Sequence, residues 1–148
     1  MSFVLDNSVA MCWLLNDGRP VDLAYALKVL DALKQTSATV PGLWALEAAN
    51  VVAKAEAKGL VTEARTQAFV ATLIRLNITT DTATASHALS ETLNLARRYK
   101  LSAYDAAYLE LALREGLPLA TLDADLEKAA KKAGVKRFDA TAATVGRN

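Results

Sequence analysis

The stretch Phe3-Val4-Leu5-Asp6-Asn7-Ser8 decides the fold class, because a short apolar run ends in three polar residues and a helical apolar pattern follows at once. The same order recurs near the C-terminus, where Leu117-Pro118-Leu119-Ala120-Thr121 precedes Asp123 and a helical pattern. Between them, Ala38-Thr39-Val40 and Asn77-Ile78-Thr79-Thr80 have the composition of short strands. Strands that alternate with helices predict an α/β fold, a three-layer α/β/α sandwich on a short, mostly parallel sheet of four or five strands. Residues 135–138 are the candidate fifth, edge strand.

Capping signals place the helices between these strands. Pro41 opens a helix that runs from about Leu43 to Lys58 and stops before Gly59. Thr62 and Ser102 are expected to cap two further helices, and residues 82–99 are expected to form one helix. In the second helix of the chain Asp22 is the expected cap, and the expected buried stripe is Tyr25, Leu27, Leu30 and Leu33.

The chain has 148 residues, of which 53% are hydrophobic, and this predicts one domain with a core of its own over residues 1–148. Residues 139–148 are expected to be a loose tail. The formal net charge of +1 gives no global field that would attract nucleic acid, so such a contact needs a local patch. Candidate cations are Lys54, Lys58, Arg97, Arg98 and Lys100, although for each a solvated helix face is the more common role.

The single Cys12 cannot form an intramolecular disulfide, and the N-terminus lacks the regions of a signal peptide. No apolar run approaches the roughly 20 residues that a membrane span needs. We therefore expect a cytoplasmic protein without a membrane segment.

Three acids stand where a strand or loop gives way to a helix. Asp6 and Asp123 follow the first and last strands, and the carboxyl ends of parallel strands are where ligands bind in such sheets. Asp105 begins an apolar helix face that continues with Tyr108 and Leu109. Each of the three also fits a simple helix cap, and Ser102 with Asp105 matches a capping box.

Glu47 has no such explanation, because it lies inside a helix between Leu43 and Val51 on the apolar stripe. A carboxylate there is costly unless it is paired or binds a metal. Asn50, one turn later, adds a second polar residue to the same predicted face. Four acids near one rim would repel one another unless a divalent cation or an arginine cluster neutralised them. Oxygen ligands favour Mg²⁺ or Mn²⁺ over zinc.

The sequence is similar to the PIN domain family in four motifs that occur in order from Phe3 to about Phe138, and most similar to its VapC toxin branch. The motifs are Asp6-Asn7-Ser8, Glu47-Ala48-Ala49-Asn50, the helix from Tyr104-Asp105-Ala106-Ala107-Tyr108-Leu109 to Ala112, and Thr121-Leu122-Asp123-Ala124-Asp125-Leu126.

The resemblance implies that four acids bind the metal and are the catalytic residues: Asp6, Glu47, Asp105 and Asp123. It also implies that the hydroxyl groups of Ser8 and Thr121 support them. Asn50 and Asp125 are further supporting positions. For Asn50 a structural role is preferred, and Asp125 stands at a position where the family varies. The implied activity is Mg²⁺- or Mn²⁺-dependent cleavage of RNA.

The resemblance also implies two protein partners, a VapB-type antitoxin and a second copy of the chain in a homodimer. The first helix is crowded with large apolar residues, Trp13, Leu14 and Leu15, and the second helix carries several more. Some of them should remain exposed, which agrees with binding to a protein partner. Two other functions stay open: a catalytically silent PIN-fold interaction module, and a housekeeping RNA-processing nuclease.

Overall fold

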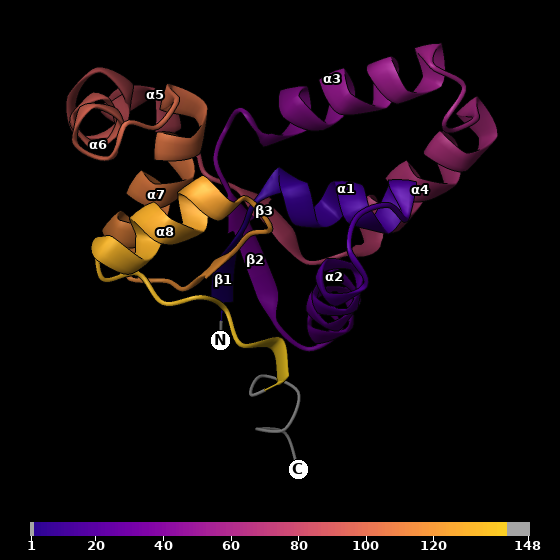
Figure 1. Ribbon diagram of the computed structural model, residues 1–148, viewed down its shortest axis with the longest axis horizontal. Coiled ribbons are helices and arrows are strands. Elements are labelled where there is room, and N and C mark those ends of the chain that lie inside the picture. The colour runs from indigo at the N-terminus through magenta and orange to yellow at the C-terminus, as the bar shows by residue number, and fades with distance from the viewer. Residues whose placement is uncertain (1, 142–148) are drawn as a thin grey trace.

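The computed structural model describes residues 2–141, and its centre is a four-stranded parallel sheet (Figure 1). The strands are β1 (Ser2–Leu5), β2 (Ser37–Val40), β3 (Ile78–Thr80) and β4 (Leu119–Ala120), in the order β3-β2-β1-β4. β1 pairs in parallel with both neighbours, Phe3 opposite Ala38 and Leu5 opposite Ala120. The predicted α/β class and parallel sheet are therefore confirmed. The predicted fifth strand is reduced to one parallel bridge between Leu119 and Arg137.

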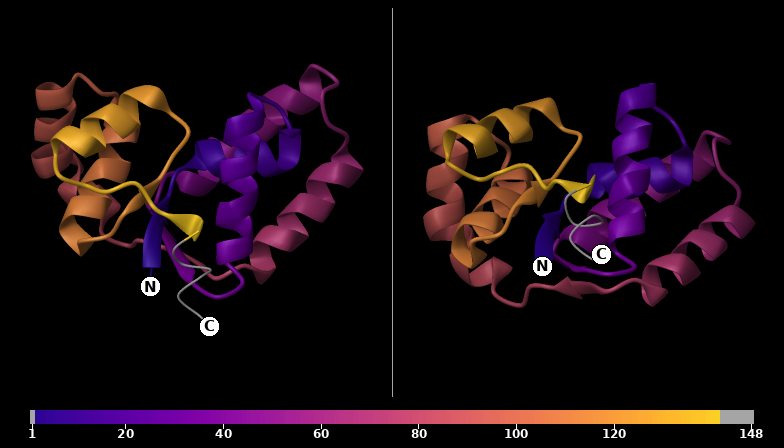
Figure 2. Two further views of the ribbon diagram at one scale, coloured as in Figure 1. Left: turned by 60° about the horizontal axis from the view of Figure 1, so that its bottom comes forward. Right: turned by 90° about the horizontal axis from the view of Figure 1, so that it is seen from below.

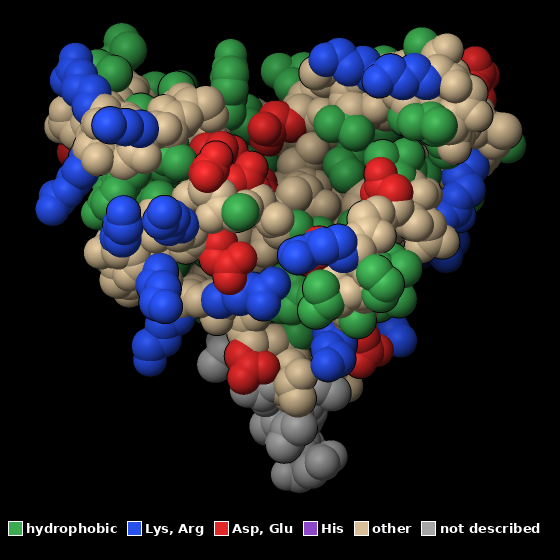
Figure 3. Space-filling view, in the orientation of Figure 1, with side chains coloured by type: hydrophobic (Ala, Val, Ile, Leu, Met, Phe, Trp, Pro, Cys, Tyr) green, Lys and Arg blue, Asp and Glu red, His purple; other side chains and the backbone are tan. Residues whose placement is uncertain are grey.

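Helices cover the sheet in two groups that spread apart above the carboxyl ends of its strands (Figures 1 and 2). The first group consists of α1 (Asn7–Leu15), α2 (Pro20–Ala32), α3 (Trp44–Ala57) and α4 (Glu63–Arg75). The second consists of α5 (Thr84–His87), a π-helical segment η1 (Ala88–Thr92), α6 (Leu93–Tyr99), α7 (Ala103–Glu115) and α8 (Ala124–Lys132). In the space-filling view the two groups form two arms with a notch between them (Figure 3).

Local signals predicted most helix ends correctly. Thr62 and Ser102 cap α4 and α7 through their side chains, each accepting a backbone N–H three residues later. α3 ends at Ala57, and Gly59 follows with a φ of 73°. Because these contacts join residues a few positions apart, the sequence is enough to place them.

The buried face of α2 differs from the prediction. Leu27 is 49% exposed, whereas Ala26, Val29, Ala32 and Leu33 are buried. Small residues form much of the face because α2 packs closely against α1, and Trp13 of α1 donates a 2.7 Å hydrogen bond to the Ala26 carbonyl. The predicted cap of α2 was also wrong. Arg19 is the N-cap, and Asp22 lies in the first turn and forms an ion pair with Arg19.

The predicted helix over residues 82–99 is divided into α5, η1 and α6. The bonds of η1 are those of a π-helix, a form that lets one extra residue enter a turn. Its buried Thr92 has a side-chain oxygen without a hydrogen-bond partner among the described residues.

The core lies between the sheet and both groups of helices. Phe3 stacks on Phe138 with ring centroids 3.8 Å apart, so β1 and the segment after α8 share one hydrophobic cluster. Ala140 is also buried, which is not expected of a loose tail, and residues 142–148 lie outside the described part. Within residues 2–141, none of the helices is long and apolar enough to cross a membrane.

Candidate metal and nuclease site

Asp6 is the residue on which the site is built. It follows β1 directly, and only 5% of it is exposed because β4 and α1 enclose it. Asp6 is the N-cap residue of α1 by its backbone, but its side chain makes no cap hydrogen bond. The capping explanation is therefore wrong for this carboxylate, which faces the ends of the strands instead.

Two hydroxyl groups hold the Asp6 carboxylate in place. Ser8 Oγ donates to Asp6 Oδ2 over 2.6 Å, and Thr121 Oγ1 donates to the same oxygen over 2.7 Å. The hydroxyl oxygens in turn accept the backbone N–H groups of Leu122 and Asp123, each over 3.0 Å. The ends of β1 and β4 are thereby joined in one network, and the supporting contacts expected of Ser8 and Thr121 are present.

Asp123 has the geometry of a helix cap. Its Oδ1 accepts the backbone N–H of Leu126 over 2.9 Å at the start of α8. The other carboxylate oxygen takes no part in the cap, so capping and a role in the site are compatible.

Asp105 lies in the first turn of α7, where Ser102 and not Asp105 is the cap. Among the described residues its carboxylate accepts no hydrogen bond. Burial raises the pKa of Asp105 to about 6, and the charges of Asp123, Asp6, Glu47 and Asp125 add to the rise. The carboxylates predicted from the sequence to share one rim therefore affect one another electrostatically.

Glu47, in the first turn of α3, crosses the notch to reach α7. It accepts a short hydrogen bond from the hydroxyl of Tyr108. Burial raises the pKa of Glu47, the Tyr108 bond opposes that rise, and the charge of Asp6 adds to it. This role of Tyr108 was not predicted from the sequence, although Tyr108 lies one turn after Asp105. It is fully buried, and a buried tyrosine hydroxyl needs a hydrogen-bond partner.

The remaining predicted positions lie at the margin. Asn50 is exposed on α3, about one turn after Glu47, and its side chain makes no hydrogen bond within the described residues, so its structural role stays a prediction. Asp125 is exposed in the first turn of α8 but contributes to the field at Asp105. Cys12 is buried as expected, and His87 lies at the surface of the second arm, beside Glu91.

The site provides oxygen ligands that suit Mg²⁺ or Mn²⁺, but it is not a closed metal cage. Within residues 2–141 no three acidic, histidine or cysteine side chains lie close enough to hold an ion as they stand. Asn7, next to Asp6, is buried, and its side-chain Oδ1 has no hydrogen-bond partner in the described part of the chain. A buried acceptor without a partner is costly, so this oxygen fits a hydrated cation.

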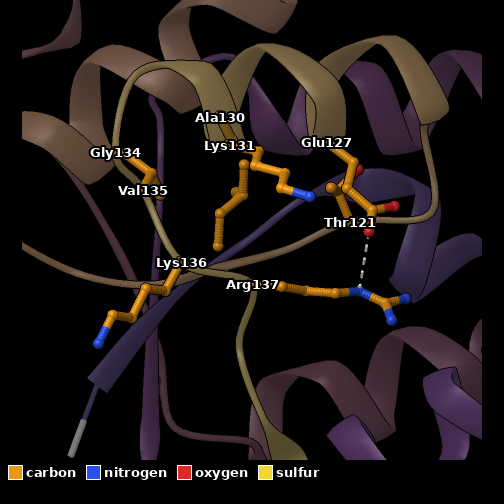
Figure 4. Close-up of a pocket in the computed structure, with 9 residues that line it drawn as sticks. Thr121, Glu127, Ala130, Lys131, Gly134, Val135, Lys136 and Arg137 are labelled. Carbon is orange, nitrogen blue, oxygen red and sulfur yellow. Dashed lines mark ion pairs between the residues drawn. The ribbon is translucent and has the colours of Figure 1, made fainter.

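Acidic side chains gather at the floor of the notch in Figure 3, in agreement with this arrangement. A separate hollow of about 460 Å³ lies under α8, where Glu127 pairs with Arg137 (Figure 4). Thr121 reaches its wall, but none of the four predicted acids does.

A sequence model of the PIN domain matches residues 3–132, which is most of the chain. The chain belongs to the PIN domain family. PIN domains are generally nucleases, so membership supports a hydrolase that acts on nucleic acid. No curated protein matches the chain in sequence.

A crystal structure of the protein PAE2754 from Pyrobaculum aerophilum is similar to this PIN domain, with a TM-score of 0.66 and 21% sequence identity. The alignment covers 100% of this chain and 91% of that one. At this identity the likeness supports the PIN-like fold and nothing finer.

Proposed function

We propose that this PIN domain is a Mg²⁺- or Mn²⁺-dependent endoribonuclease. The observation that carries the proposal is Asp105, a half-buried carboxylate that accepts no hydrogen bond from the described residues and feels four other carboxylates around it. Keeping such a group near the ends of the strands costs free energy, and a bound divalent cation would offset that cost.

Asp6, Glu47, Asp105 and Asp123 are the proposed ligands and catalytic acids. When bound, the ion would lower the pKa of a coordinated water and offset charge on the phosphodiester. The Ser8 and Thr121 hydroxyls hold Asp6 in place and oppose the rise in its pKa that burial causes. Tyr108 does the same for Glu47 by donating to its carboxylate.

We further propose that the nuclease is a VapC-type toxin that forms a homodimer and binds a VapB-type antitoxin. The first helix does not supply the exposed surface for this, since Trp13 and Leu14 are buried. Four of the exposed large apolar residues lie on and around α3 and α4, more than on any other two consecutive helices in the described chain, and an apolar surface of this kind is typical of a protein partner. They are Leu46, Leu60, Val70 and Ile74, which range from 44% to 79% exposed.

One observation favours a silent interaction module as the second candidate. The carboxylates are not close enough to hold an ion without side-chain movement. A silent module would show the fold and the partner surface but neither metal-induced stabilisation nor RNA cleavage.

Total cellular RNA incubated with the purified chain, with Mg²⁺ and with EDTA, tests the proposal directly. New RNA ends mapped by sequencing should appear only with metal, and not with the Asp105→Asn variant. Cleavage that is equal in EDTA or in the variant would contradict it. Metal-dependent stabilisation without any new ends would favour the silent module.

A further inference from the structure

Four cations from two separate helices line one hollow on the second arm. Arg98 and Lys100 come from the end of α6, and Lys128 and Lys132 come from α8, one turn apart. The hollow measures about 520 Å³, and Tyr99 and Asp125 complete its wall. Lys and Arg side chains are prominent on this arm in Figure 3.

The charges in this hollow are poorly balanced. Within the described residues none of the four cations forms an ion pair, and Asp125 is the one carboxylate in the wall. Some cations elsewhere do form ion pairs, as Arg114 does with Asp81 and Glu110, whereas others in the described part of the chain, such as Lys54 and Lys58, do not, so the hollow is distinguished by bringing four cations together. Since the net charge of the whole chain is only +1, the hollow concentrates positive charge in one place.

Helix stability explains only part of this arrangement. A lysine in the last turn of α8 suits the helix dipole, but the dipole does not bring Arg98 and Lys100 of another helix to the same hollow. Lys100 also ends α6 in the left-handed conformation with a φ of 55°, where glycine is favoured; Gly116 ends α7 with a φ of 65°. Lysine at this position therefore incurs a conformational cost.

The hollow adjoins the acidic site through Asp125. This residue belongs to the wall of the hollow, and its charge also contributes to the field at Asp105. Along α8, Lys132 is seven residues beyond Asp125, roughly 10 Å at the rise of an α-helix. A chain of phosphates held by the lysines would thus continue toward the acids.

We propose that this hollow, defined by Arg98, Tyr99, Lys100, Lys128 and Lys132, binds the phosphate backbone of single-stranded RNA and leads it to the acidic site. The inference rests on the proposed ribonuclease function. Unpaired cations with an aromatic ring in the wall are the features with which proteins bind single strands, the cations contacting phosphates and the ring a base.

The test is fluorescence anisotropy with a fluorescein-labelled 20-nucleotide single-stranded RNA, in EDTA so that it is not cleaved. The variant Lys128→Ala/Lys132→Ala is compared with Lys131→Ala/Lys136→Ala, which removes the same charge from the Figure 4 hollow, where Lys131 belongs to α8 and Lys136 to the segment after it. All four lysines are exposed, and Lys128, Lys131 and Lys132 lie in α8, where alanine favours helix, so both variants should fold.

We expect Lys128→Ala/Lys132→Ala to make the plot of log association constant against log salt concentration less steep by about 1.4. RNA binding at 0.1 M salt should weaken about 25-fold. The control should bind nearly as the wild type does. Suppose the wild type binds and cuts RNA. An equal loss of RNA affinity in both variants, or no loss in either, would then overturn this inference but not the proposed ribonuclease function. A wild type that neither binds nor cuts RNA would overturn both.

Poly-glutamate of similar length, added as a competitor, decides between RNA and an acidic protein segment. Displacement of the RNA at equal charge concentration would assign the hollow to an acidic protein and overturn the proposal. Binding that persists supports RNA.

Discussion

Thr121 Oγ1 donates a 2.7 Å hydrogen bond to Asp6 Oδ2, although the two residues are 115 positions apart in the chain. The bond joins the end of β4 to the end of β1 and supports a carboxylate whose pKa is raised by burial. The fold and the site thus depend on the same contact, and the first prediction follows from it.

Thr121→Val should lower the free energy of unfolding by about 1 to 3 kcal/mol at pH 7.5, because the buried carboxylate loses a donor and the Asp123 N–H loses its acceptor. Urea unfolding measures this. Thr79→Val on β3, where the residue is exposed, is the matched control and should change stability by less than about 0.5 kcal/mol. Equal effects in the two variants would contradict the role given to Thr121.

Asp105→Asn should abolish RNA cleavage and stabilise the metal-free protein at pH 7.5. Its raised pKa means that the folded protein disfavours the charged form, so stability falls as pH rises from the ordinary value of 3.8 through about 6. The gain in Tm in EDTA should therefore vanish near pH 4. Asp31→Asn on an exposed part of α2 is the control and should keep full activity. Cleavage by Asp105→Asn at the wild-type rate would remove Asp105 from the metal site.

Mn²⁺ affinity should fall as pH is lowered through about 6, because protonation of Asp105 competes with the ion. Titration calorimetry between pH 5 and 8 measures the effect. In Asp105→Asn the remaining affinity should lack this step. A wild-type affinity that is constant across the range would show that Asp105 is not a ligand.

Glu47→Gln should raise Tm in EDTA and reduce the stabilisation that Mg²⁺ or Mn²⁺ provides. The amide can still accept the Tyr108 hydrogen bond, while the charge that burial disfavours is gone. Melting curves with EDTA and with excess metal give both values. Glu63→Gln, at the exposed start of α4, should alter neither. An unchanged metal-induced shift in Glu47→Gln would exclude Glu47 from the site.

The isolated chain should be a dimer, and the double variant Leu46→Asp/Ile74→Asp should weaken its binding to a partner or to a second copy. Both leucine and isoleucine here are more than three-quarters exposed, so Tm should change little. Light scattering and co-purification with the protein encoded beside it measure the two associations. Leu89→Asp, on the other arm, is the comparison. Loss of association in Leu89→Asp alone would move the interface away from α3 and α4.

Features that depend on residues close together in the chain could be predicted from the sequence alone. The apolar run before Asp6 predicted β1 and the turn into α1, and Thr62 and Ser102 predicted their helix starts, because a cap joins residues three positions apart. The alternation of strands and helices then predicted the parallel sheet.

Tertiary structure decided what depends on distant partners. The sequence could not show that Tyr108 would reach Glu47 across the notch, nor that Leu27 would be exposed and Ala26 buried, since the side facing a neighbouring helix depends on how closely the two helices pack. Nor could it bring Lys100 and Lys128 to one hollow. A residue's own neighbours fix the backbone over one or two turns, but the field at a carboxylate and the partners of a lysine are set by elements that only folding brings together.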